Sequence, residues 1–342
     1  MNKEDISFNM AQSPEVILYH YKFSPYAKRV VWYLSLRGIP YTQCLQPPIL
    51  PRPDTTALGT RYRRIPILSI GRDIYLDTRL ILSKLEDLYP PCPSHPALCS
   101  EPSDQGLTQL LSIWTIETLF TKAAALIPSD MPLAKDTRFR KDREDFSGRS
   151  WDEADRERRR QEALVDVRDA FELLETKFLA DGRDWILEGE GPSLGDIEAV
   201  WPFHWLTTLH GALPPDLISP IHFPKVFSWI SRFQLRVSSL ASVNTPRTIK
   251  GDEALHTTQI ASFVEPSIGV DEQDPSGLRA GERVEVWPTD SGSAKQHRDR
   301  GRLVGLSAKE VVLETEGQGM TGLRIHTPRR GFRVRRLQAS NL

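Results

Sequence analysis

Four short stretches near the start of the chain decide its fold. They read Val16-Ile17-Leu18-Tyr19, Ser24-Pro25-Tyr26, Arg64-Ile65-Pro66-Ile67-Leu68 and Tyr75-Leu76-Asp77-Thr78. The first is a near-continuous apolar run, typical of a strand that is buried on both faces. Pro25 is placed for the first turn of a helix, and Gly38 for its end. The order therefore predicts a strand, a helix, a hairpin around Gly71-Arg72 and a second helix over 78–88.

Working outward, the next segments alternate between loop and helix signals. Residues 41–45 read as a second strand, and the proline-rich run 47–53 as a rigid loop. A Pro- and Ser-rich linker over 90–103 separates this half from one that shows only helical periodicity. In that second half, Ser193-Leu194-Gly195-Asp196 predicts a capping box at the start of an apolar helix. The charged stretch 130–160 reads as a solvated loop and the exposed start of a helix, and 241–275 as a linker.

The last part of the sequence differs in kind. Polar and apolar residues alternate in Arg283-Val284-Glu285-Val286-Trp287, and four more short strand-like runs follow before residue 335. Such spacing predicts a small β-barrel of the SH3-like pattern. Residues 275–342 hold 13 Lys+Arg against 7 Asp+Glu. A basic surface of this kind suits nucleic acid or an acidic partner, but a mixed, soluble surface is the simpler interpretation, so nucleic-acid binding is not favoured.

Length and composition limit the classes of protein to which the chain can belong. The 342 residues suggest two or three domains, and a formal net charge of −1 gives no overall attraction to nucleic acid or membranes. Cys44, Cys92 and Cys99 are too few and too scattered for a disulfide framework, which favours a reducing compartment. Neither a signal-peptide core nor an apolar run long enough to cross a membrane is present. The histidines show no metal-ligand spacing, so no metal is expected.

The order of the first four stretches resembles the glutathione-binding domain of glutathione S-transferases, and residues 105–240 resemble the all-helical second domain of that family. The run from Arg52 to Thr78 is also similar to a set of fungal proteins of this type. The resemblance covers about two thirds of the chain and leaves out the basic C-terminal part.

The resemblance, together with the strand pattern of the C-terminal part, predicts the fold and its boundaries. The predicted fold class is an α/β thioredoxin-like domain plus an all-α transferase C-terminal-like domain, with an appended small all-β SH3-like barrel. We expect a disordered tail over 1–14, the thioredoxin-like domain over 15–90, the helical domain over 104–241, a linker over 242–275 and the barrel over 276–340.

The resemblance also implies catalytic residues. Ser24 takes the place of the family's thiolate-stabilising hydroxyl or thiol, and Tyr21 is the main rival donor, with Tyr26 less favoured. A hydrogen bond to sulfur matters because the thiolate is the nucleophile, whereas a free thiol has a pKa of about 8.5. The alternative for Ser24 is an ordinary helix N-cap.

Glutathione-binding residues follow in the same way. Ile65-Pro66 is expected as a cis peptide that exposes the backbone of Ile65 to the cysteinyl part. Asp77 and Thr78 would bind the γ-glutamyl part, although Asp77 is one methylene shorter than the Glu usual in the family and could simply cap a helix. A cation for the glycyl carboxylate would come from Arg52 or from Arg61, Arg63 or Arg64.

The sequence thus predicts a glutathione S-transferase-like enzyme with glutathione as co-substrate and an electrophilic small molecule as partner. We expect a homodimer by resemblance, and a cytoplasmic location from the sparse cysteines and the lack of a signal-peptide core. The alternative is a non-catalytic binding or scaffold protein that acts through the basic C-terminal barrel. A Ser in place of Cys disfavours thiol transfer through a mixed disulfide.

Overall fold

The computed structural model describes residues 14–99, 101–291, 296–315 and 322–337; most of the expected N-terminal tail lies outside these ranges. The first part is a four-stranded sheet in the order β2-β1-β3-β4, in which β1 is parallel to β2 and antiparallel to β3. This is the predicted thioredoxin-like arrangement. Its elements are β1 (Val16–His20), α1 (Pro25–Arg37), β2 (Thr42–Leu45), α2 (Pro53–Ala57), β3 (Ile67–Ile70), β4 (Asp73–Leu76) and α3 (Thr78–Leu88).

Strand β1 is buried on both faces, as its apolar run predicts. Val16 and Leu18 join the core on the side of α1 and α3, whereas Ile17 and Tyr19 join a second core on the opposite side. The alternation follows from the period of two along a strand. One strand therefore anchors two separate layers of packing.

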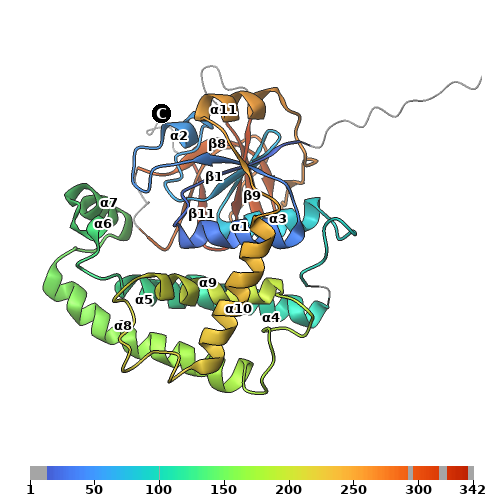
Figure 1. Ribbon diagram of the computed structural model, residues 1–342. Helices are drawn as coiled ribbons and strands as arrows, with labels where there is room; N and C mark the ends of the chain where they lie inside the picture. The colour runs from blue at the N-terminus through green and yellow to red at the C-terminus, as the bar shows by residue number, and fades with distance from the viewer. Residues whose placement is uncertain (1–13, 100, 292–295, 316–321, 338–342) are drawn as a thin grey trace, which may run out of the picture.

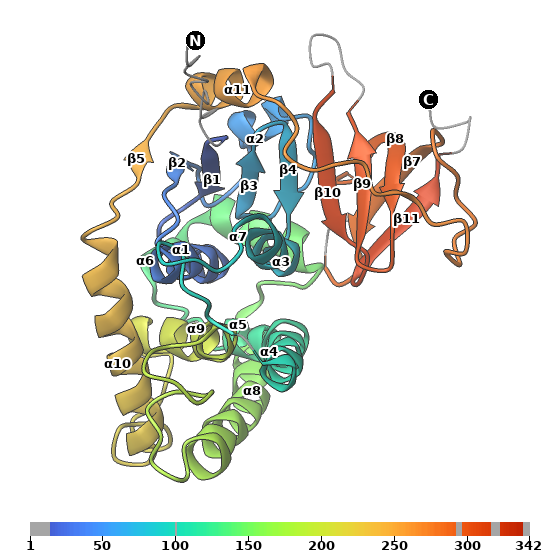
Figure 2. The same ribbon diagram turned by 90° about the vertical axis from the view of Figure 1, so that its right-hand side faces the viewer.

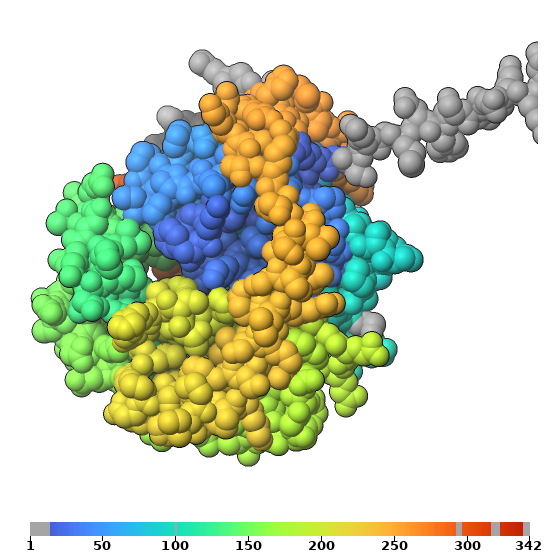
Figure 3. Space-filling view, viewed as in Figure 1, coloured from blue at the N-terminus to red at the C-terminus, as the bar shows by residue number. Residues whose placement is uncertain are grey.

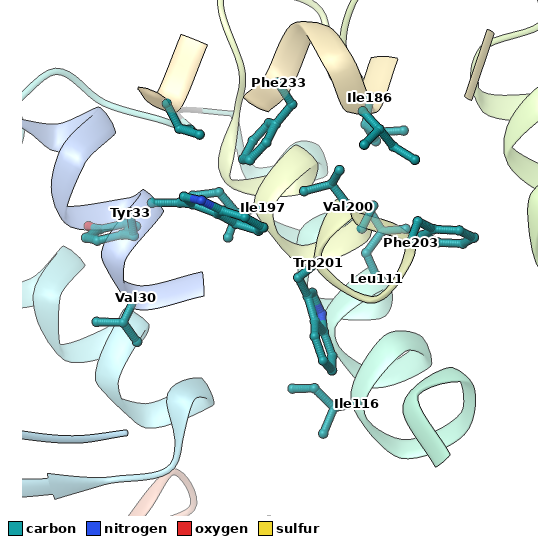
Figure 4. Close-up of a cluster of buried hydrophobic side chains, with 14 of the residues drawn as sticks. Val30, Tyr33, Leu111, Ile116, Ile186, Ile197, Val200, Trp201, Phe203 and Phe233 are labelled. Atoms are coloured by element: carbon teal, nitrogen blue, oxygen red, sulfur yellow. The ribbon is translucent and has the colours of Figure 1, made fainter. Parts of the chain in front are cut away.

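The second part is helical and lies beneath α1 and α3 (Figure 1). Its core gathers around Trp201 and Phe203, with Phe233 and Ile116 nearby (Figure 4). Its elements are α4 (Pro102–Ile113), the π-helix η1 (Trp114–Leu119), α5 (Phe120–Ala125), α6 (Pro132–Lys135), α7 (Thr137–Ser147), α8 (Glu153–Leu173), the π-helix η2 (Leu174–Phe178), α9 (Leu194–Thr208) and α10 (Pro224–Ala241).

The predicted capping box is present at the start of α9. The Ser193 hydroxyl accepts the Asp196 amide at 3.1 Å, and the Asp196 carboxylate accepts the Ser193 amide at 2.8 Å. The same carboxylate also accepts the Trp229 indole N–H at 2.8 Å, which ties α9 to α10. The cap therefore orients two helices as well as starting one.

The charged stretch 130–160 is more ordered than predicted. It forms α6, α7 and the start of α8, and α7 reaches the thioredoxin-like part through Arg63, which donates to Asp142 at 3.0 Å and also pairs with Asp145. Arg63 also lies over the Phe146 ring, at 5.3 Å. The prediction of a loop failed because these contacts are ionic and cation–π and leave little apolar periodicity.

The segment expected as a linker is also structured. Residues 242–275 contain β5 (Arg247–Thr248), which pairs with β2, then α11 (Gly251–Ile260) and β6 (Gly269–Val270). Ile249 and Ala254 belong to the second core, on the face of the sheet away from α1 and α3. The segment from α10 to α11 runs over the surface from the helical part to the sheet (Figure 3). These elements are too short for a clear periodic signal.

The five predicted C-terminal strands are present, but they do not close into the SH3-like barrel. The order is β11-β7-β8-β9-β10-β4, so β10 pairs in parallel with β4 instead of with β11 (Figure 2). The C-terminal sheet thus continues the thioredoxin-like sheet and shares its second core. The strands are β7 (Arg283–Pro288), β8 (Asp299–Leu306), β9 (Glu310–Glu314), β10 (Arg324–Pro328) and β11 (Phe332–Arg336).

A buried charged cluster joins the two sheets at this seam. His326 on β10 donates from Nε2 to Asp73 at 3.0 Å and from Nδ1 to Glu310 at 3.1 Å, which requires the imidazolium form. Burial alone would lower the pKa of His326, but these two carboxylates raise it above the ordinary value. Lys84 of α3 completes the cluster by binding Glu310 at 2.6 Å and also Glu265.

Two further properties of the described ranges bear on function. Glu265, Glu310 and His326 lie close enough to bind a metal ion, with their ligand atoms within 4.8 Å of one another. The Lys84 ammonium already binds both carboxylates, so we interpret the group as part of the ion-pair cluster at the seam. None of the helices in these ranges has the length and apolar character needed to cross a bilayer.

Candidate functional site

The sheet brings the three predicted site segments to one edge. In the register of the sheet, Tyr19 near the end of β1 lies opposite Ile67 at the start of β3, and Ile67 lies opposite Leu76 at the end of β4. The residues that follow β1, precede β3 and follow β4 must therefore emerge together. These residues include Ser24, Ile65-Pro66 and Asp77-Thr78, which form the candidate site.

Ser24 is the N-cap of α1. Its hydroxyl oxygen accepts the Ala27 amide at 3.2 Å. This is the structural role that the sequence offered as an alternative, and it uses the oxygen only as an acceptor. The hydroxyl proton stays available for donation, and the positive end of the α1 dipole lies beside it. Capping and thiolate stabilisation are thus compatible.

The two tyrosines near Ser24 have different surroundings. Tyr21 is half-buried and packs against the exposed Phe23, with ring centres 4.7 Å apart. Tyr26 instead packs between Phe120 and Trp201 of the helical part, at 4.8 and 4.7 Å. Burial raises the pKa of Tyr26. Tyr26 therefore serves the joint between the two parts.

The Ile65-Pro66 peptide bond is cis, as the sequence predicts. Arg64, directly before it, donates to Asp290 at 3.1 Å, and Asp290 follows β7 in the C-terminal sheet. The C-terminal sheet thus reaches the candidate site at its cis-proline segment.

Asp77 has an unusual backbone conformation, with φ of 70°. Such angles are uncommon outside glycine, are tolerated best by Asn and Asp, and gather at ligand-binding positions. Its carboxylate caps α3 by accepting the Arg79 amide at 3.1 Å, and the Arg79 side chain donates to it at 2.9 and 3.1 Å. Burial would raise the pKa of Asp77, but Arg79 outweighs burial and the pKa lies below its usual value.

Thr78 is bound to a buried arginine of α1. Arg29 of α1 donates to the Thr78 hydroxyl and forms an ion pair with Glu198 of α9. Its guanidinium also lies 5.4 Å from the centre of the Trp201 ring. Arg29 therefore links α1, α3 and α9 directly beneath the candidate site.

Arg52, predicted as a cation for the glycyl carboxylate, binds backbone carbonyl oxygens in this structure. Its guanidinium donates to the carbonyl oxygens of Pro47 at 2.8 Å, Pro48 at 2.9 Å and Arg63. Burial lowers the pKa of Arg52 to about 10. These contacts hold the proline-rich loop against the segment before the cis peptide, so Arg52 shapes the site from behind.

The turn between β10 and β11 covers the start of α3. Arg330 in this turn donates to Glu117 at 3.1 and 3.2 Å, and Arg79 reaches the same carboxylate at 3.4 Å. A Cβ on Gly331 would come within 3.0 Å of the Arg79 guanidinium, so the backbone of the turn lies against it. The four residues Ser24, Ile65, Asp77 and Thr78 of the candidate site are only 2 to 9 % exposed.

Sequence reasoning missed the arginines that occupy this site. Arg79 stands two residues after Asp77, and at this spacing a side chain can reach back to the residue that caps its own helix. The sequence alone could therefore have predicted the Arg79–Asp77 pair. Arg29 lies on the helix that Ser24 caps, but its partners Thr78 and Glu198 come from distant segments. Asp290, Glu117 and Arg330 likewise come from elements whose placement no local pattern specifies.

Comparisons with known proteins agree with this fold. The fold and site define a thioredoxin-like domain joined to a helical domain. The family model described as glutathione S-transferase, N-terminal domain, matches residues 18–94, and a domain of unknown function, DUF7962, matches residues 122–242. Residues 18–94 therefore match the N-terminal domain of glutathione S-transferases.

Solved structures extend the likeness to most of the chain. A GST-like protein from Pseudomonas syringae is 24% identical with a TM-score of 0.70, and the match covers 95% of this chain and all of the other. A glutathione S-transferase from Sinorhizobium meliloti is 19% identical with a TM-score of 0.50, covering 67% of this chain and 92% of the other. The first match extends into the C-terminal sheet. A comparison with curated proteins found no match.

Proposed function

We propose that the protein binds glutathione and activates its thiolate for attack on an electrophilic small molecule. The observation that carries the proposal is the meeting of Ser24, the cis Ile65-Pro66 peptide and Asp77-Thr78 at one edge of the sheet. A fold of this class with these three segments together supports a peptide-like thiol as ligand. Localisation in the cytoplasm and a homodimeric state are part of the proposal.

The proposed roles follow from the contacts. Ser24 donates its free proton to the glutathione sulfur, while its oxygen keeps the Ala27 amide. That donor and the N-terminal end of α1 both favour thiolate over thiol. The backbone of Ile65 pairs with the cysteinyl part, and Asp77 binds the γ-glutamyl ammonium. Arg79 pairs with Asp77 in this structure. In the complex, Arg79 either shares the Asp77 carboxylate with the γ-glutamyl ammonium or turns toward the γ-glutamyl carboxylate.

Substitution of Ser24 tests the catalytic role. Hydrogen bonds to charged groups contribute about 1.5–3 kcal/mol, so Ser24→Ala should lower the rate of conjugation to an activated aryl halide by about ten- to a hundredfold. Ser24→Thr keeps both the cap and the hydroxyl and should retain most of the rate. If Tyr21→Phe removes the activity and Ser24→Ala does not, the role belongs to Tyr21.

A non-catalytic binding role is the second candidate, and one observation favours it. Asp77 and Thr78 already have arginine partners, and the turn with Arg330 and Gly331 covers the start of α3. In a protein that has lost catalytic activity, these contacts would keep the site closed permanently. Retention on immobilised glutathione distinguishes the two, because a permanently closed site would not retain the protein.

A further inference from the structure

A row of four alternating charges runs from the candidate site to the C-terminal sheet. Asp77 accepts the Arg79 side chain at 2.9 and 3.1 Å. Arg79 also reaches Glu117, and Glu117 in turn accepts two hydrogen bonds from Arg330, at 3.1 and 3.2 Å. This charge row joins three parts of the molecule, because Asp77 and Arg79 lie at the start of α3, Glu117 belongs to η1, and Arg330 to the turn between β10 and β11.

The weakest link of the charge row is the contact between Arg79 and Glu117. Its N–O distance is 3.4 Å, beyond the usual range of an N–H···O hydrogen bond, whereas the other distances lie between 2.9 and 3.2 Å. Side-chain exposure rises along the row, from 9 % at Asp77 and 16 % at Arg79 to 39 % at Glu117 and 56 % at Arg330. Partly exposed ion pairs contribute little net stability, so a ligand can replace this contact at small cost.

The order of the charges sets the kind of group that fits between Arg79 and Glu117. A group with a carboxylate and an ammonium on the same carbon atom continues the alternation, because its carboxylate meets the Arg79 guanidinium and its ammonium meets the Glu117 carboxylate. Such a group is the α-amino-acid end of a ligand. Two acids and two cations in the row balance this zwitterion, so no charge of the protein or the ligand is left uncompensated.

We propose that Glu117 and Arg330 bind the α-amino-acid end of the γ-glutamyl group. Glu117 accepts the ammonium beside Asp77, which is possible because an ammonium has three donors. Arg330 joins Arg79 on the carboxylate, since Glu117 accepts only two of the five N–H donors that an arginine carries.

The C-terminal sheet thereby takes a direct part in ligand selection. The turn that carries Arg330 is held close to the site, because a Cβ on Gly331 would come within 3.0 Å of the Arg79 guanidinium. The inference rests on the proposed glutathione-binding function and deepens it. It restricts the ligands to γ-glutamyl thiols that have both a free α-amino group and a free α-carboxylate.

Two analogues of glutathione, each lacking one of these groups, test the proposal by calorimetric titration of the full chain. Glutaryl-cysteinylglycine lacks the α-amino group, and 4-aminobutanoyl-cysteinylglycine lacks the α-carboxylate. Glu117→Gln should weaken binding of glutathione and of the aminobutanoyl analogue by about fivefold, the upper end of what partly exposed ion pairs contribute, without weakening the glutaryl analogue. Arg330→Gln should weaken glutathione and the glutaryl analogue to a similar extent, without weakening the aminobutanoyl analogue.

Two further variants control for the change in net charge. Asp166→Asn and Arg302→Gln each remove one exposed charge outside the charge row, from the pairs Lys122–Asp166 and Arg302–Glu314. Both should leave the affinities for all three ligands unchanged. A purely structural role of Glu117 or Arg330 would instead weaken the three ligands equally.

The possible results distinguish a failure of the glutathione site from a failure of this assignment. Wild-type protein that binds none of the three ligands would contradict the glutathione site, and the assignment of Glu117 and Arg330 with it. If the wild type binds glutathione but Glu117→Gln and Arg330→Gln lose no affinity, or lose it equally for all three ligands, the assignment is overturned and the glutathione site stands.

Discussion

At the scale of single residues, the candidate site depends on two buried arginines whose guanidinium groups have different kinds of partner. Arg52 is satisfied by backbone carbonyl oxygens and fixes a loop. Arg29 binds the Thr78 hydroxyl and the carboxylate of Glu198 at the joint between the thioredoxin-like and helical parts. A buried ion pair adds little net stability, but removing one partner leaves a charge that nothing compensates.

Glu198→Ala should therefore destabilise the protein strongly. The loss of the carboxylate leaves the Arg29 guanidinium buried and unpaired, at a cost of about 3–5 kcal/mol in the free energy of unfolding. Denaturant unfolding measures this cost. Asp166→Ala is the control, because the Lys122–Asp166 pair is exposed (43 % and 49 %) and should contribute about 0–1 kcal/mol. Similar losses in the two variants would show that the buried pair has no special role.

At the scale of elements, the segment 242–275 packs against the sheet at the β3–β4 hairpin. Gly71 in its turn has φ of +57°, and a Cβ there would lie 2.2 Å from the carbonyl oxygen of Ser262. The neighbouring Arg72 amide donates to the same oxygen at 3.1 Å. Packing of the segment after α11 against this turn thus requires, at Gly71, both the left-handed conformation and the absence of a side chain.

Gly71→Ala should destabilise the protein more than the same change at a free left-handed position. Gly148, the C-cap of α7, has φ of +66° with no atom within 4 Å of a built Cβ, so Gly148→Ala should cost only about 1–2 kcal/mol for its backbone conformation. Gly71→Ala adds a clash with backbone and should exceed this. Chemical denaturation compares the two, and equal costs would mean that the segment moves away freely.

At the scale of the whole molecule, one sheet runs from β5 to β11 and joins the thioredoxin-like strands to the C-terminal strands. Pairing of β10 with β4 removes an exposed strand edge, which would otherwise invite pairing with another chain. The His326 cluster lies at this seam, with Asp73 from β4, Glu310 from β9, Lys84 from α3 and Glu265 facing it.

The contribution of this seam to the free energy of unfolding should therefore depend on pH. The pKa of His326 is raised in the folded protein, so its contribution is fully present below the unfolded value of about 6.5 and is lost as pH rises through the folded value. The difference in free energy of unfolding between the wild type and His326→Gln should be largest near pH 6 and should shrink as pH rises above neutrality. Urea unfolding across this range measures it; a difference that grows with pH would contradict the charged form of His326.

Patterns that act over a few residues predicted much of this structure. The run Val16–Tyr19, the cap at Ser193 and the helix over 78–88 each follow from a local period or a capping residue, and each is present. The pairing of β10 with β4 joins segments far apart in sequence, and it depends on a shared core that no local pattern describes. For the same reason the sequence placed Asp77 and Thr78 correctly at a helix start but could not show that Arg79 and Arg29 already bind them.

The central claim, a glutathione site at the sheet edge, is tested most directly by calorimetric titration with reduced glutathione. Asp77→Asn is the matched variant, because Asn can keep the cap and the positive φ of 70° while removing the charge. The account predicts saturable binding to the wild type at millimolar or tighter affinity, and clearly weaker binding to the variant. No heat of binding and no thermal stabilisation of the wild type would contradict it.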